Sequence, residues 1–396
     1  MVNNDSQTPV RPDEPIPHRK VIRAWLVPFA TREIMRPVAL LVLDYLLLFA
    51  AFAGALLIPS IVGKIACGMA AGFITGRLFI IGHDACHQSL TPHRRLNRWL
   101  GRIAFLPSLT PYSLWEVGHN VVHHGYTNLK GFDFVWAPHT PAEFAALSPV
   151  RRMLDRIYRS GWAPGLYYLV EVWWLRMYFP TKTYIGASRP VFRRDCLLVT
   201  GFAAVWIAAV VWVALATRQP VALLLATGVL VPFLFWVSMI GFVVYVHHTD
   251  PRIAWHANRT EWSNAAPFVS TTLHLTFRFG IGGLLHHIME HTAHHVDMSV
   301  PLYQLKPAQA KLEDMLPGRI VVQPFSWRWY FDTARRCKLY DTEHHYWTDY
   351  LGNRTSERTS APPAPGTPAP PAPGTPAPPA PGTPAPAGAE LRHTVS

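Results

Sequence analysis

Residues 220–247 read PVALLLATGVLVPFLFWVSMIGFVVYVH and contain no lysine or arginine. A helix needs about 20 apolar residues to cross the hydrocarbon core of a bilayer, so this stretch is long enough to span a membrane. The run ends on His247 and is followed by His248, which places imidazoles where the helix would leave the membrane. The stretch therefore predicts a membrane helix with polar chemistry at one end.

Three more stretches have the length of a membrane span. Residues 37–63 and 197–217 also lack lysine and arginine, and residues 65–81 are interrupted only by Arg77 near one end. One such run could be a buried helix of a soluble protein, but four runs in two closely connected pairs argue against that alternative. We predict an all-α membrane protein with four transmembrane helices as two hairpins, spanning about residues 38–60, 63–82, 196–217 and 220–246.

The charge of the chain is large and unevenly placed. Of 396 residues, 50% are hydrophobic and only 15% are charged, yet the formal net charge is +12. The short connections within the two predicted hairpins hold only Lys64 and Arg218. Because basic residues favour the cytoplasmic side, we expect both termini and the central segment in the cytoplasm, with a helical cap there that carries the histidines described below. A nucleic-acid-binding protein would interleave its basic and apolar residues, so we expect no nucleic-acid partner.

The two ends of the chain differ in composition from the spans. Residues 1–36 place basic residues and prolines ahead of any apolar run, the wrong order for a signal peptide, and are expected to form a cytoplasmic N-terminal segment. Residues 351–396 are expected to form a disordered tail, because the octapeptide APPAPGTP occurs three times in succession from Ala361 and cannot build a core. The membrane domain is thus predicted to cover residues 37–350.

An aromatic segment lies between the predicted hairpins. Residues 162–179 are apolar but interrupted by Glu171 and Arg176, and they are rich in tryptophan and tyrosine. This composition favours a helix lying in the headgroup layer, and an ordinary packed helix beneath the membrane is the alternative.

The 20 histidines of the chain are concentrated in a few clusters. Three pairs are separated by four residues, so on an α-helix each pair would lie on one face and converge on one metal ion. Eight clustered imidazoles exceed the four ligands of a tetrahedral zinc ion, so two ions sharing them is the economical interpretation. Imidazole suits iron, copper, nickel and zinc, so the ligand set does not name the metal. The pairs are His83 with His87, His119 with His123 and His291 with His295, and His124 and His294 are their neighbours.

A competing pattern overlaps the last cluster. Residues 287–291 match HxxEH, which on a helix is a zinc-peptidase pattern. Such a short match inside a larger histidine cluster is weak support, so we keep it only as an alternative.

The clustered histidines stand in three boxes that read His83-Asp-Ala-Cys-His87, His119-Asn-Val-Val-His123-His124 and His291-Thr-Ala-His294-His295. Their order, separations and positions relative to the predicted spans resemble the three-box signature of the integral-membrane fatty acid desaturase family, over roughly residues 23–350. The segments 245–251, 256–262 and 293–303 look like its delta-12 or omega-6 branch, in which a histidine just past the fourth span accompanies the boxes. His248 matches that histidine.

The resemblance implies a non-haem di-iron centre with nine histidine ligands. Two departures concern regioselectivity more than metal binding: Gln88 stands where many omega-6 members carry a third histidine, and the second box has three residues before its histidine pair where many have two. The implied ligands are His83, His87, His119, His123, His124, His248, His291, His294 and His295.

The family activity implies an oxidoreductase that uses O2 and two electrons to introduce a cis double bond into a membrane-associated fatty acyl chain. The resemblance to the delta-12 or omega-6 branch favours the delta-12 position. The four cysteines lack iron-sulfur spacing and no haem segment is fused, so electrons are expected from a separate ferredoxin or cytochrome b5-type donor. The acyl carrier could be a lipid, coenzyme A or a carrier protein. The preference for arginine and the composition of the tail associate the chain with a GC-rich bacterium, hence with its inner membrane.

Carboxylates near the boxes are candidates for holding the ligand rings, because a metal-bound imidazole usually donates its other N–H to a carboxylate or carbonyl. Asp84 and Glu290 are the first candidates. Glu116, Asp133 and Asp297 follow.

Two ionisable residues lie inside the predicted spans. Asp44 and Arg77 are each roughly six residues from the cytoplasmic ends of antiparallel neighbours, so we predict that they pair within the bundle. The alternative is that Arg77 extends to a lipid phosphate.

Other functions fit parts of the same pattern. The same iron site could perform hydroxylation, ketolation or acetylenic-bond formation on a fatty acid, carotenoid or alkane, and no single residue separates these outcomes. A metal transporter with histidine-rich loops is less favoured, because transport needs polar ligands near mid-membrane and the spans are apolar at their centres.

Overall fold

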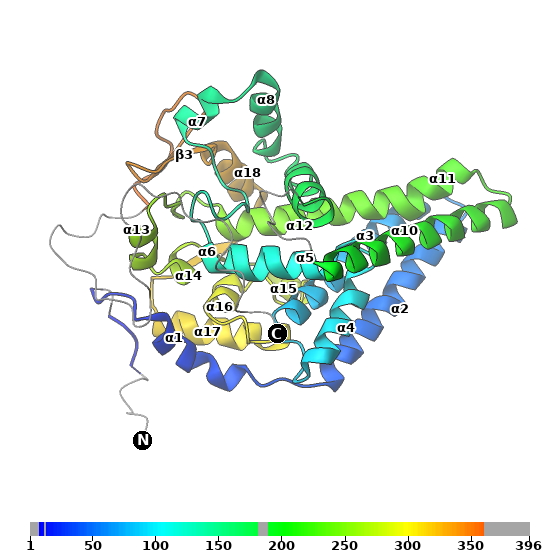
Figure 1. The fold of residues 1–396 in the computed structure, drawn as a ribbon, viewed down its shortest axis with the longest axis horizontal. Coiled ribbons are helices and arrows are strands. Elements are labelled where there is room, and N and C mark those ends of the chain that lie inside the picture. Colours follow the sequence, from blue (N-terminus) through cyan, green and yellow to red (C-terminus); the bar gives the residue numbers. More distant parts are fainter. Residues whose placement is uncertain (1–7, 12, 181–188, 360–396) are drawn as a thin grey trace.

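The computed structural model describes residues 8–11, 13–180 and 189–359, so the APPAPGTP repeats of the predicted disordered tail lie outside the described residues. Within these ranges four helices are long and apolar enough to cross a membrane, as predicted. They project together from one side of the molecule, and the shorter elements gather at their other ends (Figure 1). They are α2 (Met35–Leu57), α3 (Ile61–Cys86), α10 (Pro190–Ala216) and the continuous helix Val221–His248, made of α11 (Val221–Leu225), a π-helical turn η5 (Ala226–Leu230) and α12 (Val231–His248).

The remaining elements are short. The helices are α1 (Arg19–Leu26), η2 (Val27–Phe29), α4 (Arg94–Phe105), α5 (Tyr112–Glu116), η3 (Val117–His123), α6 (His124–Tyr126), α7 (Pro141–Ala146), α8 (Pro149–Tyr158), α9 (Pro164–Tyr167), η4 (Tyr168–Tyr178), α13 (Arg259–Asn264), α14 (Pro267–Ser270), η6 (Arg278–Gly280), α15 (Ile281–Leu284), α16 (His291–Val296), η7 (Leu302–Gln304), α17 (Leu305–Met315) and α18 (Trp327–Arg336). The strands form a parallel pair, β1 (Leu273–Thr276) with β2 (Val321–Pro324), and an antiparallel pair, β3 (Leu339–Asp341) with β4 (Tyr346–Thr348).

Two helix ends differ from the predicted spans. α3 continues past residue 82 to Cys86, so His83 lies on the span helix itself. α10 begins at Pro190, before the predicted residue 196, and proline is well suited to the first turn of a helix because it has no N–H to leave unpaired.

Close backbone contact joins α3 to the fourth span. A Cβ atom on Gly68 would lie 2.6 Å from the carbonyl oxygen of Thr227, and one on Gly72 would lie 2.5 Å from that of Pro232. Small residues four apart let two membrane helices approach closely, and van der Waals contact then holds them together. This contact fixes the end of α3 relative to the end of α12, where both helices carry histidines.

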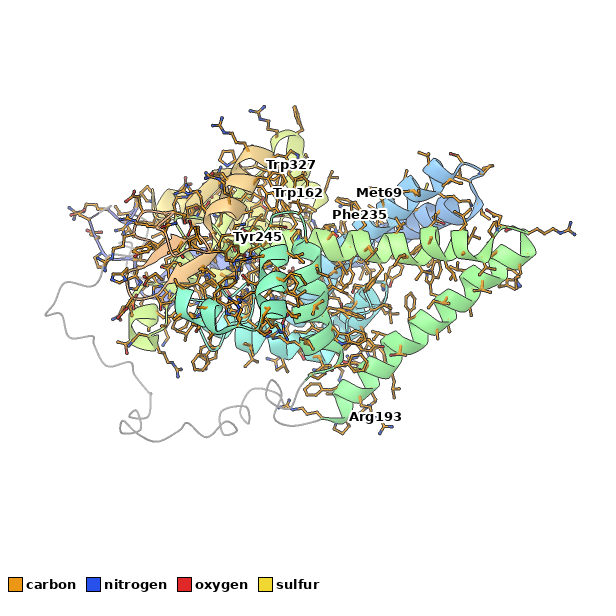
Figure 2. All side chains as sticks on the ribbon, turned by 90° about the horizontal axis from the view of Figure 1, so that it is seen from above. Met69, Trp162, Arg193, Phe235, Tyr245 and Trp327 are labelled. Carbon is orange, nitrogen blue, oxygen red and sulfur yellow. The ribbon has the colours of Figure 1, made fainter. Side chains whose placement is uncertain are left out.

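α10 packs far less tightly than the other spans. Figure 2 shows it leaving the body of the molecule near Arg193 at an angle to the fourth span. Val205 and Trp212 are 70% and 69% exposed. Apolar side chains so exposed on a membrane-length helix suit contact with lipid chains.

The predicted pairing of Asp44 and Arg77 is confirmed. Arg77 Nη2 lies 2.8 Å from Asp44 Oδ1, and both side chains are buried. The sequence did not indicate a third member, His286, whose Nε2 lies 2.8 Å from the other carboxylate oxygen of Asp44. Arg77 also donates to the carbonyl oxygen of Leu284. The buried carboxylate thus ties α2 and α3 to the loop that leads into α16.

We expect Asp44→Asn to destabilise the protein strongly. Loss of the carboxylate leaves the buried Arg77 guanidinium without its counter-charge, and removal of one partner of a buried ion pair costs about 3–5 kcal/mol. The check is the monodisperse yield and thermal unfolding of purified protein in detergent. Asp314→Asn, at an exposed position on α17, is the control and should leave both unchanged. Equal stability of the two variants would contradict a structural role for the pair.

The packed part of the chain reaches past residue 351, where the sequence places the start of the tail. Thr355 N donates to Trp347 O and Thr359 N donates to His345 O, each at a distance of 2.8 Å. Residues 353–359 thereby line the β3–β4 pair, and the hydroxyls of Thr355, Ser356 and Thr359 add side-chain hydrogen bonds.

Candidate metal centre

Four segments bring the nine predicted ligands together. α3 carries His83 near its end, and His87 follows directly after it. The η3–α6 segment, the last residue of α12 and the short helix α16 supply the others. The ligand atoms form two groups, within each of which all atoms lie within 4.8 Å of one another. One group contains His83, His87, His119, His124 and His294, and the other contains His123, His248, His291 and His295.

The second box divides between the groups in a way that corrects the prediction. His119 and His123 were expected to share one metal as an α-helical pair, but η3 is a π-helix, in which hydrogen bonds join residues five apart. His119 and His124 therefore face the same way, with their Nε2 atoms 3.2 Å apart, and His123 points to the other group. The four-residue pairs of the first and third boxes each stay within one group, as predicted.

Ring nitrogens converge closely in the five-histidine group. The Nε2 atom of His83 lies 2.7 Å from that of His119 and 3.3 Å from that of His87. The Nε2 atoms of His124 and His294 are 3.0 Å apart. A neutral imidazole offers one donor and one acceptor, so five converging nitrogens cannot satisfy one another fully.

The four-histidine group has the same character. His248 Nε2 lies 3.1 Å from His123 Nε2 and 2.9 Å from His291 Nε2. The Nε2 atom of His295 is buried and has no hydrogen-bond partner. A cation at each centre would satisfy these nitrogens together, so the residues present fit two metal ions.

The protonation states also suit metal binding. Burial lowers the pKa of the His119, His124 and His294 imidazoles well below the usual histidine value. Burial has the same effect on the pKa of His291 and His295. A lowered pKa leaves the ring neutral at pH 7, and only the neutral ring has a lone pair for a metal.

Outer hydrogen bonds orient the rings of the four-histidine group. Both carboxylate oxygens of Asp133 lie 3.1 Å from His123 Nδ1. The carbonyl oxygen of Thr271 lies 2.9 Å from His248 Nδ1, and the hydroxyl of Thr127 lies 3.2 Å from His295 Nδ1. Each contact leaves the Nε2 atom of its ring facing the centre.

Of the five carboxylates considered from sequence, Asp133 is the one that hydrogen-bonds to one of the nine rings. The first-ranked Asp84 lies 3.5 Å from His83 Nδ1 and accepts instead from the backbone N–H of Leu302 at 2.6 Å. Glu290 contacts His287, which belongs to neither group. The remaining two, Glu116 and Asp297, contact Gln88 and Arg23.

We expect Asp133→Asn to reduce activity and metal retention by about 10–100-fold, the usual effect of removing the outer partner of a ligating histidine. The amide offers one acceptor where the carboxylate holds His123 and also accepts from the backbone N–H groups of Asn128 and Val135. Product formation and metal content per chain are the measurements. Glu290→Gln is the matched control and should stay close to wild type, and equal effects of the two variants would contradict the role of Asp133.

The HxxEH alternative is wrong in this fold. Residues 285–289 form turns, and His286 and His287 have positive φ angles of 50° and 59°. His287 therefore does not share a helix face with His291, which a zinc-peptidase helix would require.

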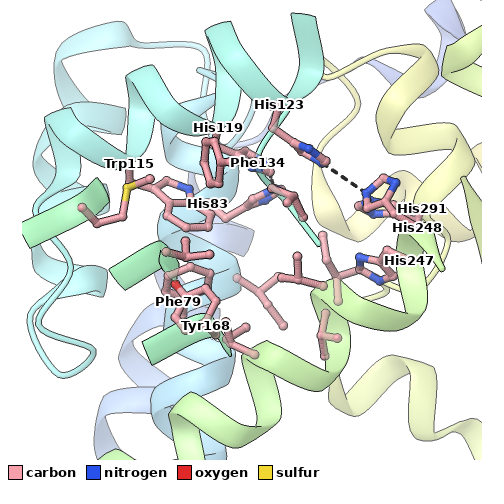
Figure 3. A pocket seen from close by; sticks show the side chains of 18 residues that line it. Phe79, His83, Trp115, His119, His123, Phe134, Tyr168, His247, His248 and His291 are labelled. Carbon is pink, nitrogen blue, oxygen red and sulfur yellow. Dashed lines mark hydrogen bonds between the residues drawn. The ribbon is translucent and has the colours of Figure 1, made fainter. Parts of the chain in front are cut away.

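An apolar cavity borders both histidine groups (Figure 3). It lies between α3, η3, η4 and α12. His83 and His119 of one group and His123, His248 and His291 of the other reach its wall. His247, which the sequence did not single out as a ligand, also lines it and stacks on His291 with ring centroids 3.6 Å apart. The apolar lining includes Phe79, Trp115, Tyr168, Val172, Met177, Ile240 and Val243.

The four spans, the two imidazole groups at their ends and the apolar cavity beside them define a class of membrane proteins that hold a pair of metal ions next to a site for an apolar molecule. Comparison with known proteins narrows this class. A family model described as fatty acid desaturase matches residues 59–327. The chain therefore belongs to the fatty acid desaturase family and is an oxidoreductase, as the sequence indicated.

Named proteins that are similar to this chain are also desaturases. The chain is 31% identical over 295 residues to an sn-1 oleoyl-lipid 12-desaturase of Picosynechococcus sp., covering 69% of this chain and 77% of that protein. It is 28% identical over 279 residues to the protein of the same name in Synechocystis sp., covering 68% and 74%. It is also 29% identical over 274 residues to a chloroplastic omega-6 fatty acid desaturase of Arabidopsis thaliana, covering 69% and 58%.

Proposed function

We propose that this desaturase introduces a cis double bond at the delta-12 or omega-6 position of a membrane-associated fatty acyl chain. The observation that carries the proposal is that one apolar cavity has members of both histidine groups in its wall. An extended acyl chain in this cavity would lie against both groups at once. The names of the relatives favour a second double bond placed beyond an existing one.

The nine histidines would hold two non-haem iron ions, five rings on one and four on the other. When bound, such a pair supplies activation of O2 and removal of hydrogen from unactivated methylenes. The protein's own contributions are positional: Asp133, Thr271 and Thr127 hold the rings, and the aromatic and aliphatic cavity wall excludes water from the reacting carbons.

The remaining parts of the chain fit a cytoplasmic site. We infer that residues 1–36 and the C-terminal part from residue 351 lie in the cytoplasm, on either side of a membrane domain over residues 37–350, and that the membrane is the bacterial inner membrane. The +12 charge would attract an acidic ferredoxin or cytochrome b5-type donor to this side. The acyl chain would enter with its carrier, a lipid, coenzyme A or a carrier protein, left at the membrane surface.

The test is expression in a host with a simple lipid profile, followed by mass spectrometry with double-bond location. We expect a new acyl species that has lost two hydrogens, with its new double bond at the delta-12 position. A product that has gained oxygen would contradict desaturation and indicate that the same scaffold performs hydroxylation. Unchanged fatty acids, with the protein present in the membrane and holding iron, would contradict an acyl substrate.

A further inference from the structure

A third cluster of metal-ligating side chains lies outside the nine histidines. His256, Glu261 and His345 each offer a ligand atom, and these atoms lie within 4.8 Å of one another. The Oε1 atom of Glu261 lies 2.9 Å from His256 Nδ1 and 3.4 Å from His345 Nε2. The side chain of His256 is fully buried and that of His345 is 8% exposed, whereas Glu261 is 26% exposed. Two buried imidazoles therefore meet one carboxylate at the edge of the protein.

The β3–β4 turn is built to point His345 inward. Asp341 Oδ1 accepts hydrogen bonds from the backbone N–H groups of Glu343 and His344, which fixes the turn. His345 then adopts a φ of 58°, a conformation that a residue other than glycine seldom takes. Its neighbour His344 points outward, with 64% of its side chain exposed. The turn thus directs one of two adjacent histidines inward and the other toward solvent.

The other two members are equally well fixed. His256 exchanges backbone hydrogen bonds with the segment before Asp133, donating to Asn128 O at 3.0 Å and accepting from Lys130 N at 2.9 Å. Glu261 lies in the first turn of α13, where Asn258 Oδ1 accepts from its N–H at 3.1 Å. The three side chains thus come from a loop, a helix and a hairpin whose positions are each set by the backbone.

The donor set and its spacing suit a divalent transition metal. Burial lowers the pKa of His256, which leaves its ring neutral at pH 7 with a lone pair available. Two imidazoles and one carboxylate are a common zinc donor set, and bonds of about 2.0–2.1 Å place the ligand atoms of a tetrahedral ion roughly 3.4 Å apart. The 3.4 Å separation of Glu261 Oε1 from His345 Nε2 matches that value, and the 2.9 Å separation from His256 Nδ1, a hydrogen bond in this structure, is about 0.5 Å shorter. The partial exposure of Glu261 leaves a side open for a water molecule as fourth ligand.

We propose that His256, Glu261 and His345 form a separate binding site for one zinc-class divalent ion, distinct from the two-ion centre. The ion would tie the β3–β4 pair to the segment that follows η3 and α6. That segment reaches the main centre, because Asn128 N donates to Asp133 Oδ2 at 3.0 Å and Asp133 is hydrogen-bonded to His123. Loss of this ion is expected to leave the two-ion centre loaded, and the proposal does not depend on the proposed regioselectivity.

The test compares four full-length proteins purified in detergent: wild type, His345→Ala, Glu261→Gln and the control His344→Ala. Each is incubated with excess zinc chloride alone and desalted, and zinc and iron per chain are measured by elemental mass spectrometry. We expect wild type and His344→Ala to retain equal zinc, and His345→Ala and Glu261→Gln to retain one zinc ion fewer. Iron per chain should be equal in all four, which separates this site from the main centre.

Equal zinc in all four proteins would overturn the proposal and leave the cluster as a set of polar contacts. If His345→Ala fails to fold, Glu261→Gln decides the outcome, because it preserves side-chain volume at a partly exposed position. A loss of zinc in His344→Ala equal to that in His345→Ala would also overturn it, since the turn and not the inward imidazole would then be responsible.

Discussion

Replacing His294 with alanine is expected to abolish product formation while the protein remains in the membrane. His294 is fully buried, and its Nε2 lies 3.0 Å from His124 Nε2 within the five-histidine group. Its loss removes a ligand outright, so the effect should exceed the about 10–100-fold cost of losing an outer partner. The measurement is the amount of new unsaturated fatty acid per unit of membrane-embedded protein.

The control for this prediction is another histidine with no place in either group. His344→Ala removes an exposed imidazole that contacts the side chains of Asp341 and Tyr346, and should leave the yield of product unchanged. Full activity in His294→Ala would contradict the metal centre, because four remaining rings on that side would then have sufficed.

Val243→Trp is expected to block binding of the acyl substrate without lowering the amount of bound metal. Val243 lines the cavity on α12, one helical turn before His247, and is 3% exposed. An indole there would fill space that the acyl chain needs, so product should fall by more than about 10-fold, although overpacking of this kind costs about 1–3 kcal/mol of stability. Iron per chain should stay at the wild-type value.

Val205→Trp provides the matched control, since it makes the same substitution at a 70% exposed position on α10. It should leave both product and iron unchanged. If Val243→Trp retained full activity, the acyl chain would have to bind somewhere other than this cavity. If both variants lost iron, the effect would be one of folding and not of substrate exclusion.

Much of the architecture follows from local sequence. Apolar runs of membrane length predict the four spans, because length and composition alone decide whether a helix can cross a bilayer. The pairing of Asp44 with Arg77 follows from depth, since two opposite charges at one level of a bundle have few other partners. The clustering of histidines at the span ends also follows from sequence, because the predicted span boundaries place His83 and His248 just beyond the ends of two spans.

The grouping of the nine rings does not follow from spacing. The π-helical segment η3 sends His119 and His124 to one group and His123 to the other, and this winding depends on packing that a four-residue spacing does not reveal. The choice of Asp133 over Asp84 depends on a loop with positive φ at Asn128 and Gly131, which turns the carboxylate back toward His123. His286 likewise reaches Asp44 from 242 residues away, a contact that only tertiary structure creates.

Iron per chain in purified wild-type protein tests the central claim most directly. The two imidazole groups predict two iron ions per chain, one for each group. His294→Ala and His291→Ala, which remove a ring from different groups, should each lower that value. One iron ion or none in an active wild-type enzyme would contradict a two-ion centre built from these nine histidines.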